Sequence, residues 1–178
     1  MITCKIISKP TVMIDLLSNF DLLNYSKLLH IPLHNVLSKD LFNKVKPKEG
    51  GYIINLQDHD EGNGTHWTAL VLLHDHAIYY DSFGVVPPKD IRKFVRRYSK
   101  NMPILYSTDQ VQPLKSVLCG WYCLFFLYYF TVMHKNSKAN ARYLQNKHNG
   151  IFSKDQRYLN DKILQQIIKN IMIENKII

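Results

Sequence analysis

Four polar residues stand in a chain order that suits the attack of a thiol on a carbonyl carbon. They are His66, Asp81, Gln112 and Cys119. A histidine can accept the proton of the thiol, and a carboxylate can fix the tautomer and orientation of the ring. A glutamine amide can donate a hydrogen bond to the oxyanion that forms on the attacked carbonyl. The set therefore predicts acyl transfer by a cysteine nucleophile, with these four residues as its catalytic group.

Cys119 is the candidate nucleophile because of its place in the chain. A loop ends there, and a long apolar run, 121–133, begins just after it. A helix that starts at this cysteine would bring the positive end of its dipole to the thiol and favour the thiolate. Gly120 would allow a substrate to come close to the backbone. We interpret Cys4 and Cys123 as inert buried thiols, the usual state of a lone cysteine.

His66 and Asp81 flank a predicted β-hairpin. Residues 67–73 and 77–81 are rich in residue types that favour strands, and a short polar link joins them. Antiparallel pairing would return the chain to the edge from which it started. We therefore expect the imidazole and the carboxylate to meet there and to form a hydrogen bond.

The other histidines and the choice of glutamine are less informative. His74 and His76 flank an aspartate in the hairpin turn, but no second pair of ligands stands at metal spacing. No metal site is therefore expected. Gln110 and Gln112 both precede the nucleophile in its loop. Residue type alone does not choose between them.

Helical and strand-like segments surround these residues. We expect short helical pieces over about 13–42, broken at Pro32, and strands at 52–56, 67–73, 77–81 and 102–106. Further helices are expected over about 87–100, from Cys119 through the apolar run, and over about 155–172. The run is apolar all round, which is typical of a helix inside the core. Strands in the middle with helices around them predict an α+β domain.

Length and composition limit the class of protein. A chain of 178 residues, 46% of them hydrophobic, can bury one sizeable core, so a single domain over residues 1–178 is expected. Three cysteines are an odd and sparse set, which favours a reducing compartment over a disulfide framework. Residues 1–10 lack the apolar core of a signal peptide, so secretion is not expected. The run 121–133 is shorter than the roughly 20 residues that span a bilayer, and no membrane segment is expected.

The chain is strongly basic. Its formal net charge is +9 and its isoelectric point is near 9.4. A helix over 87–100 would gather five cations on one face: Arg92, Lys93, Arg96, Arg97 and Lys100. A second basic stretch begins at Lys135. Such surfaces attract polyanions. The face is therefore either a nucleic-acid groove or an ordinary solvated helix surface, and both interpretations stay open.

The motifs together resemble those of the adenovirus-type maturation proteases and, more distantly, of the SUMO-type proteases that act on ubiquitin-like proteins. The matching elements cover roughly residues 52–130 and are His66-Trp67, Tyr79-Tyr80-Asp81-Ser82-Phe83-Gly84, Gln112-Pro113 and Cys119-Gly120, with Cys123 four residues on. In the adenovirus-type pattern the oxyanion glutamine stands seven residues before the cysteine, as Gln112 does. SUMO-type enzymes usually carry aspartate just before the nucleophile, where this chain has Leu118. The resemblance favours the viral branch.

The resemblance implies a fold and a set of roles. The fold would be a papain-like core with a central mixed β-sheet, a buried helix that carries the nucleophile at its N-terminus, and flanking helices. His66 would be the general base, Asp81 its orienter, Cys119 the nucleophile and Gln112 the oxyanion donor. Trp67 would pack beside the site. The enzyme would be a cysteine endopeptidase whose chemistry requires no cofactor.

The resemblance also implies a biological role. Adenovirus-type enzymes cut capsid and other virion precursor proteins at glycine-containing sites, with DNA and a short viral peptide as activators. No cysteine stands shortly before Gln112, where the relatives form a disulfide to that peptide, so activation is expected to differ. A composition rich in lysine, isoleucine and asparagine indicates an A/T-rich genome, such as that of a virophage or a Polinton-type element. We expect a monomer in the virion and the infected cell, with virion precursors and DNA as its candidate partners.

Two other functions could use the same residues. An isopeptidase that removes ubiquitin-like tags would share the site and would prefer tags that end in Gly-Gly. A DNA-binding virion protein that retains a protease fold would bind DNA with a steep salt dependence and would have an unreactive Cys119. The complete set of four residues argues against the second of these functions, whereas nothing in the chain decides the first.

Overall fold

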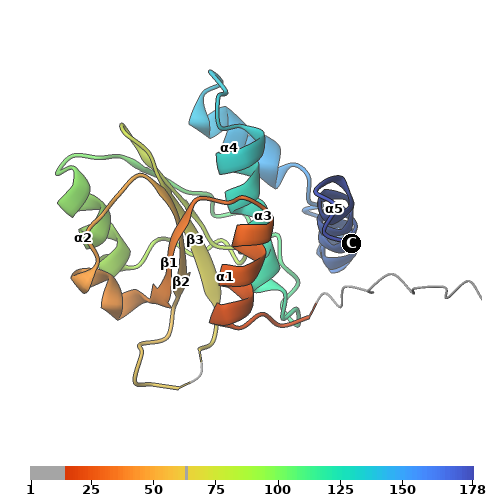
Figure 1. Cartoon of the computed structure of the whole chain (residues 1–178), viewed down its shortest axis with the longest axis horizontal. Helices are drawn as coiled ribbons and strands as arrows, with labels where there is room; N and C mark the ends of the chain where they lie inside the picture. Colours follow the sequence, from red (N-terminus) through yellow and green to blue (C-terminus); the bar gives the residue numbers. More distant parts are fainter. Residues whose placement is uncertain (1–14, 63) are drawn as a thin grey trace, which may run out of the picture.

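The structure, a computed structural model, describes residues 15–62 and 64–178 (Figure 1). Predictions for residues 1–14, including those for Cys4 and for a helical start near residue 13, lie outside these ranges. The helices are α1 (Asn19–Leu28), α2 (Lys89–Tyr98), α3 (Cys119–Tyr128), α4 (Ala141–Asn149) and α5 (Asn160–Glu174). The strands are β1 (Leu33–Ser38), β2 (Gly50–Asn55), β3 (Trp67–Leu72), β4 (Ala77–Tyr80) and β5 (Ile104–Leu105). Short 3-10 helices occupy Lys39–Lys44 (η1) and Arg157–Leu159 (η3), and a π-helical turn, Tyr129–Met133 (η2), extends α3.

The five strands form one mixed sheet in the order β1-β2-β3-β4-β5. The two outer pairings, β1 with β2 and β4 with β5, are parallel. The two central pairings are antiparallel, and the hairpin of β3 and β4 places Ala69 opposite Tyr80 and Leu72 opposite Ala77. The predicted α+β fold with a central mixed sheet is therefore confirmed.

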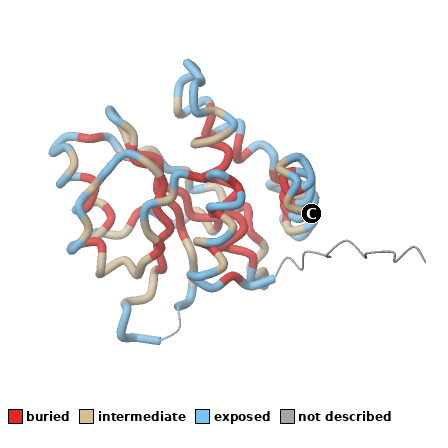
Figure 2. Tube along the Cα trace, viewed as in Figure 1, coloured by how far each residue is buried: buried red, intermediate tan, exposed pale blue. Residues whose placement is uncertain are grey.

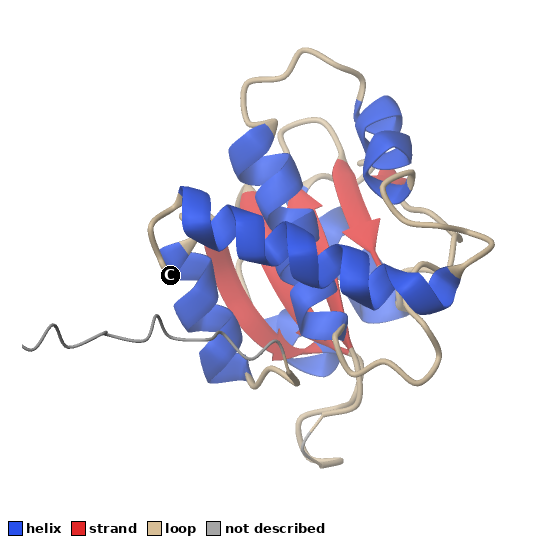
Figure 3. Ribbon diagram, turned by 90° about the vertical axis from the view of Figure 1, so that its right-hand side faces the viewer, coloured by secondary structure: helices blue, strands red, loops and turns tan. Residues whose placement is uncertain are grey.

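Helices cover both faces of the sheet (Figures 1 and 3). Residues of α1, α3 and α5 pack on one face, whereas α2 and η1 pack on the other. Neighbouring strand residues alternate between the two layers: Ile53 faces α3, and Tyr52 faces α2. Buried positions are accordingly concentrated in the strands and in α3 (Figure 2).

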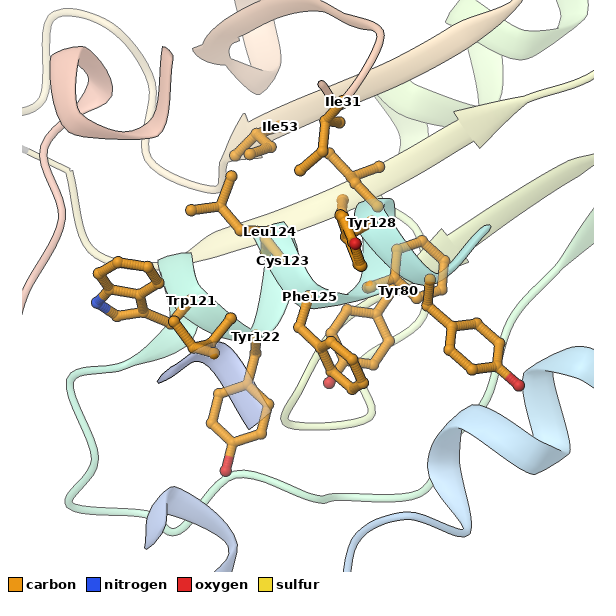
Figure 4. Packing of buried hydrophobic residues seen from close by; sticks show 14 of the residues in the cluster. Ile31, Ile53, Tyr80, Trp121, Tyr122, Cys123, Leu124, Phe125 and Tyr128 are labelled. Carbon is orange, nitrogen blue, oxygen red and sulfur yellow. The ribbon is translucent and has the colours of Figure 1, made fainter. Parts of the chain in front are cut away.

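Helix α3 runs through the middle of the larger core. Every residue from Cys119 to Tyr128 is buried. Side chains such as Trp121 and Phe125 project from different sides of the helix into this core (Figure 4). Tyr80 of β4 stacks on Phe126 with ring centroids 4.6 Å apart. The expectation of a buried helix that begins at Cys119 is confirmed.

The prediction that helical pieces extend through residues 33–38 is wrong. Helix α1 ends at Leu28, and His30 then adopts a positive φ of 55° before Pro32. The following residues form β1, which pairs in parallel with β2 from Leu33 opposite Gly51 to Ser38 opposite Asn55. The partner strand lies beyond η1, so local periodicity could not reveal the pairing.

The carboxy-terminal part also differs from expectation. Helix α4 was not anticipated; Asn140 caps it by accepting hydrogen bonds from the amides of Arg142 and Tyr143. The last helix begins at Asn160 rather than near residue 155, and β5 is shorter than the strand predicted at 102–106. No helix in the described ranges is both long and apolar enough to cross a membrane.

Candidate active site

The hairpin of β3 and β4 brings His66 and Asp81 together. His66 stands one residue before β3, and Asp81 follows the last residue of β4. Nε2 of His66 is 2.9 Å from Oδ1 of Asp81. The side chain of Asp81 is fully buried, and that of His66 is 12% exposed. The expected hydrogen bond between the two side chains is therefore present.

Cys119 is the second partner of the imidazole. It is the first residue of α3, and its side chain lies beside His66 at the same cleft. Because Nε2 faces Asp81, the nitrogen that remains for the sulfur is Nδ1. The imidazole thus lies between the carboxylate and the thiol, in the order that general-base activation of a cysteine requires.

The surroundings of His66 favour its protonated form. Burial by itself would lower the pKa of His66, but the hydrogen bonds and charges of Asp81 and Cys119 outweigh it and raise this pKa to about 9. His66 is therefore an imidazolium at neutral pH. A cation beside the sulfur at the N-terminus of α3 is the setting that stabilises a thiolate.

Phe83 shields one face of the imidazole. Its ring centroid is 4.7 Å from that of His66. The backbone amide of Phe83 also donates to Oδ1 of Asp81, at 2.8 Å, so this oxygen accepts two hydrogen bonds. Phe83 belongs to the matching motif, but no role was predicted for it. Its position two residues after the carboxylate is a signal for this contact, because a turn amide can reach back from there.

Gln112 lies buried in the loop that leads to the nucleophile. Its Oε1 accepts from the hydroxyl of Ser82 at 2.5 Å, and its Nε2 donates to the carbonyl of Ser116 at 2.9 Å. Gln110 instead donates through Nε2 to the backbone carbonyl of Gln112, at 3.0 Å. The structure therefore fixes the Gln112 amide firmly, while its role as oxyanion donor stays a prediction.

Asp161 in the first turn of α5 anchors the end of the same loop. Its Oδ1 accepts from the hydroxyls of Ser116, at 3.0 Å, and Tyr122, at 3.1 Å. The Ser116 hydroxyl in turn accepts from the amide of Leu118, at 3.2 Å. Sequence reasoning missed Asp161, because nothing near it in the chain marks the contact with the loop.

His66 and Cys119 open onto a cleft of about 520 Å³. Leu16, Leu17 and Asp21 line one side, Val36 and Leu41 another, and Trp67 lies beside the histidine as expected. The indole of Trp67 donates to the carbonyl of Leu17, at 3.1 Å, and the indole of Trp121 donates to that of Asp15, at 2.8 Å. Two tryptophans, one directly after the histidine and one two residues after the cysteine, thus hold this wall of the cleft in place.

The glycine after the nucleophile has a different use from the one predicted. A Cβ at Gly120 would lie 3.1 Å from Cβ of Leu17 and 3.3 Å from Cδ2 of Leu22. The side-chain space at this position is therefore filled by α1 and the segment before it. The expectation that Gly120 makes room for a substrate is corrected accordingly: it makes room for the wall of the cleft.

The remaining candidate residues lie away from this cleft. Cys123 is fully buried, and burial, followed by the charges of Cys119 and Asp81, raises its pKa well above the ordinary value. His76 hydrogen-bonds Asp75, and His74 lies 3.6 Å from Glu49. Within residues 15–62 and 64–178, no group of three or more histidine, cysteine or acidic side chains is arranged to hold a metal ion.

The basic residues of α2 divide into two groups. Arg97 donates to the backbone carbonyls of Phe42, Asn43 and Val45, and Arg92 donates to that of Pro87. These two arginines therefore tie α2 to neighbouring segments. Lys93 and Arg96 of α2, and Lys100 two residues after its end, are exposed. Binding of nucleic acid by this face stays a prediction.

Comparison with known proteins supports the fold. No protein-family model and no curated protein matches the chain. The crystal structure of the ASFV pS273R protease is similar, with a TM-score of 0.50 and 18% identity over 82% of this chain and 70% of that chain. Its selenomethionine form gives a TM-score of 0.47 and 16% identity over 82% and 71% of the two chains. At such identities the likeness to the first structure shows a shared α+β fold.

Proposed function

We propose that this protein is a cysteine endopeptidase. The observation that carries the proposal is the imidazole of His66, which is hydrogen-bonded to the carboxylate of Asp81 and lies beside the thiol of Cys119 at one cleft. The thiol stands at the start of a buried helix and faces a cleft large enough for a peptide segment. The fold shared with a protein named as a protease is consistent with this function.

The proposed reaction proceeds in two steps. His66 and Cys119 form an imidazolium–thiolate pair, and the thiolate attacks the carbonyl carbon of the substrate. The amide of Cys119 and the side-chain amide of Gln112 donate to the oxyanion. His66 then gives its proton to the leaving amine, and later takes a proton from the water that releases the acyl group. Asp81 holds the ring throughout.

The proposed substrates are precursor proteins of a virion, cut at glycine-containing sites during maturation. This part rests on the adenovirus-type motif pattern around the four residues. The exposed cations of α2 and the net charge of +9 support DNA as an activating partner. A virophage or Polinton-type element is the source that the composition favours.

Co-expression tests this function. The enzyme is produced with the capsid proteins that its own genome encodes, and the products are measured by intact mass. Cys119→Ala should abolish cleavage. Cys123→Ala is the matched control, because it removes a thiol one helical turn further along the same helix and should retain cleavage.

The outcome also separates the competing functions. Cleavage by the wild type alone, after a glycine, supports the maturation protease. Cleavage only of a ubiquitin-like tag ending in Gly-Gly would instead identify a deconjugating isopeptidase. Cleavage that persists in Cys119→Ala would refute the nucleophile, and DNA binding with no cleavage of either substrate would favour a binding protein with a protease fold.

A further inference from the structure

Ser82 makes three hydrogen bonds to the loop that precedes the nucleophile. Its carbonyl accepts from the amides of Val111 and Gln112, both at 2.9 Å. Its hydroxyl donates to Oε1 of Gln112 at 2.5 Å. Ser82 is completely buried, and Gln112 is 1% exposed. The contact is therefore isolated from water, which would otherwise compete for the same groups.

The hydrogen-bond partners define which way the Gln112 amide points. The carbonyl of Ser116 can only accept, so the nitrogen of the amide must face it. The amide oxygen must then face Ser82, and the Ser82 hydroxyl must donate rather than accept. One hydrogen of Nε2 is used by Ser116, and the second makes no hydrogen bond to any described residue.

Ser82 adjoins the residue that orients the base. Asp81 holds His66 through its carboxylate, and the next residue holds Gln112 through its hydroxyl. The terminal orientation of a glutamine amide is otherwise only weakly restricted by its torsion. The dipeptide Asp81-Ser82 after β4 therefore fixes both the base and the amide that is proposed to donate to the oxyanion.

We infer that Ser82 is a positioning residue that orients the Gln112 amide so that its second N–H is available to the oxyanion. The inference rests on the proposed function, in which Gln112 is the oxyanion donor. Ser82 acts through Gln112 and does not itself touch the substrate. Its loss should therefore reduce the rate of the chemical step and leave binding of the substrate nearly unchanged.

The kinetic test uses Ser82→Ala and a fluorogenic peptide amide that ends in glycine. Loss of one oxyanion donor typically costs about 10²- to 10³-fold in rate, and loss of its orientation should cost less, on the order of 10-fold in kcat with little change in KM. In a Gln112→Ala background the same substitution should have no further effect. Ser82→Thr and Ser82→Val form a pair matched in size, and only the threonine should retain activity.

A second measurement is independent of hydrolysis. The two side-chain amide protons of Gln112 are followed by ¹⁵N-resolved NMR, and their exchange with water should be faster in Ser82→Ala than in the wild type. Alkylation of Cys119 by iodoacetamide should keep the wild-type rate, because thiolate formation does not involve the oxyanion donor.

Each outcome has a defined meaning. Unchanged kcat in Ser82→Ala, an additive loss in the Gln112→Ala background, or unchanged exchange of the Gln112 amide would overturn the inference. Equal losses in Ser82→Thr and Ser82→Val would also overturn it, because they would indicate packing rather than the hydroxyl. Absence of hydrolysis by the wild type would count against the proposed function, while the amide exchange would still decide whether Ser82 orients Gln112.

Discussion

The two faces of the sheet are built differently. On the α3 face, a helix that is buried all round carries Cys119 at its start, and the hairpin edge beside it carries His66 and Asp81. On the α2 face, a helix with one buried side packs Phe94 against Phe42 and Tyr52, with ring centroids 5.1 and 5.0 Å apart. Its other side is exposed and basic.

The difference assigns the catalytic residues to one face of the sheet and a purely packed core to the other. A thiolate–imidazolium pair gains strength where water is excluded, and α3 supplies that burial. The α2 face has no comparable cluster of ionisable groups among the described residues. Arg92 and Arg97 donate to backbone carbonyls, and the aromatic rings of this face fill the smaller core. We therefore expect substitutions on the α3 edge to affect catalysis and those on the α2 face to affect stability or association with polyanions.

Replacement of the base should have the largest effect. His66→Ala removes the general base and the counter-ion of the thiolate, so kcat/KM should fall by about 10²- to 10⁴-fold. The thermal midpoint should fall as well, because the buried carboxylate of Asp81 loses its partner, so hydrolysis is compared per folded molecule. Steady-state hydrolysis and thermal unfolding measure the two effects. Wild-type hydrolysis by His66→Ala would show that this histidine takes no part in the mechanism.

Truncation in the smaller core should lower stability and leave the chemical step unchanged. Phe94→Ala leaves a cavity among Phe42 and Tyr52, and the free energy of unfolding should fall by about 3–5 kcal/mol. The fraction that remains folded should keep the wild-type kcat, measured at low temperature after active-site titration. If kcat per folded molecule fell with stability, the two faces would be coupled and the contrast would fail.

The carboxylate next to the base should set the alkaline limit of activity. The ion pair needs protonated His66, so kcat/KM of the wild type should decline as the pH rises through about 9. Asp81→Asn removes the first of the partners that raise this pKa, and the decline should move to lower pH. Asp75→Asn, at the opposite end of the hairpin, is a matched control and should leave the profile in place. An unshifted profile in Asp81→Asn would mean that another group supports the imidazolium.

The same pKa shift contributes to stability. Because the pKa of His66 is raised on folding, the contribution is fully present below the ordinary value of 6.5 and is lost as the pH rises through about 9. Denaturant unfolding of the wild type should therefore show decreasing stability between these limits. This dependence should be weaker in Asp81→Asn than in Asp75→Asn.

The exposed cations of α2 should have the smallest effect, limited to polyanion binding. Lys93→Gln with Arg96→Gln should lower the salt dependence of DNA binding by about two units of log–log slope. Hydrolysis without DNA should be unchanged. Lys162→Gln with Lys169→Gln makes the same charge change on α5 and is the control. Equal losses of DNA affinity in the two double variants would show that net charge, and not this face, attracts DNA.

Features with a local cause were predictable from the sequence. The run after Cys119 predicted the buried helix α3 because it is apolar on every side. The hairpin predicted that Asp81 lies near His66, because antiparallel strands return the chain to the edge from which it started. The choice of Gln112 over Gln110 came from the resemblance to a protease family. In the structure Gln112 is buried, and its side-chain amide makes two hydrogen bonds.

Features with a distant cause were not predictable. Strand β1 exists because β2 pairs with it from beyond η1. Ser82 and Asp161 act on the loop before the nucleophile from positions 30 and 45 residues away from their partners. Arg97 looked like part of a basic face, but its carbonyl partners lie more than 50 residues earlier in the chain. Such contacts follow from the packing of elements and leave no periodic signal.

The most direct test of the account is the site and rate of alkylation by a small amount of iodoacetamide near neutral pH. Peptide mass spectrometry then distinguishes Cys4, Cys119 and Cys123. We predict rapid modification of Cys119, little modification of Cys123, and a large decrease in the Cys119 rate in His66→Ala. Slow modification of Cys119 that is unchanged in His66→Ala would contradict the thiolate–imidazolium pair on which the proposed function depends.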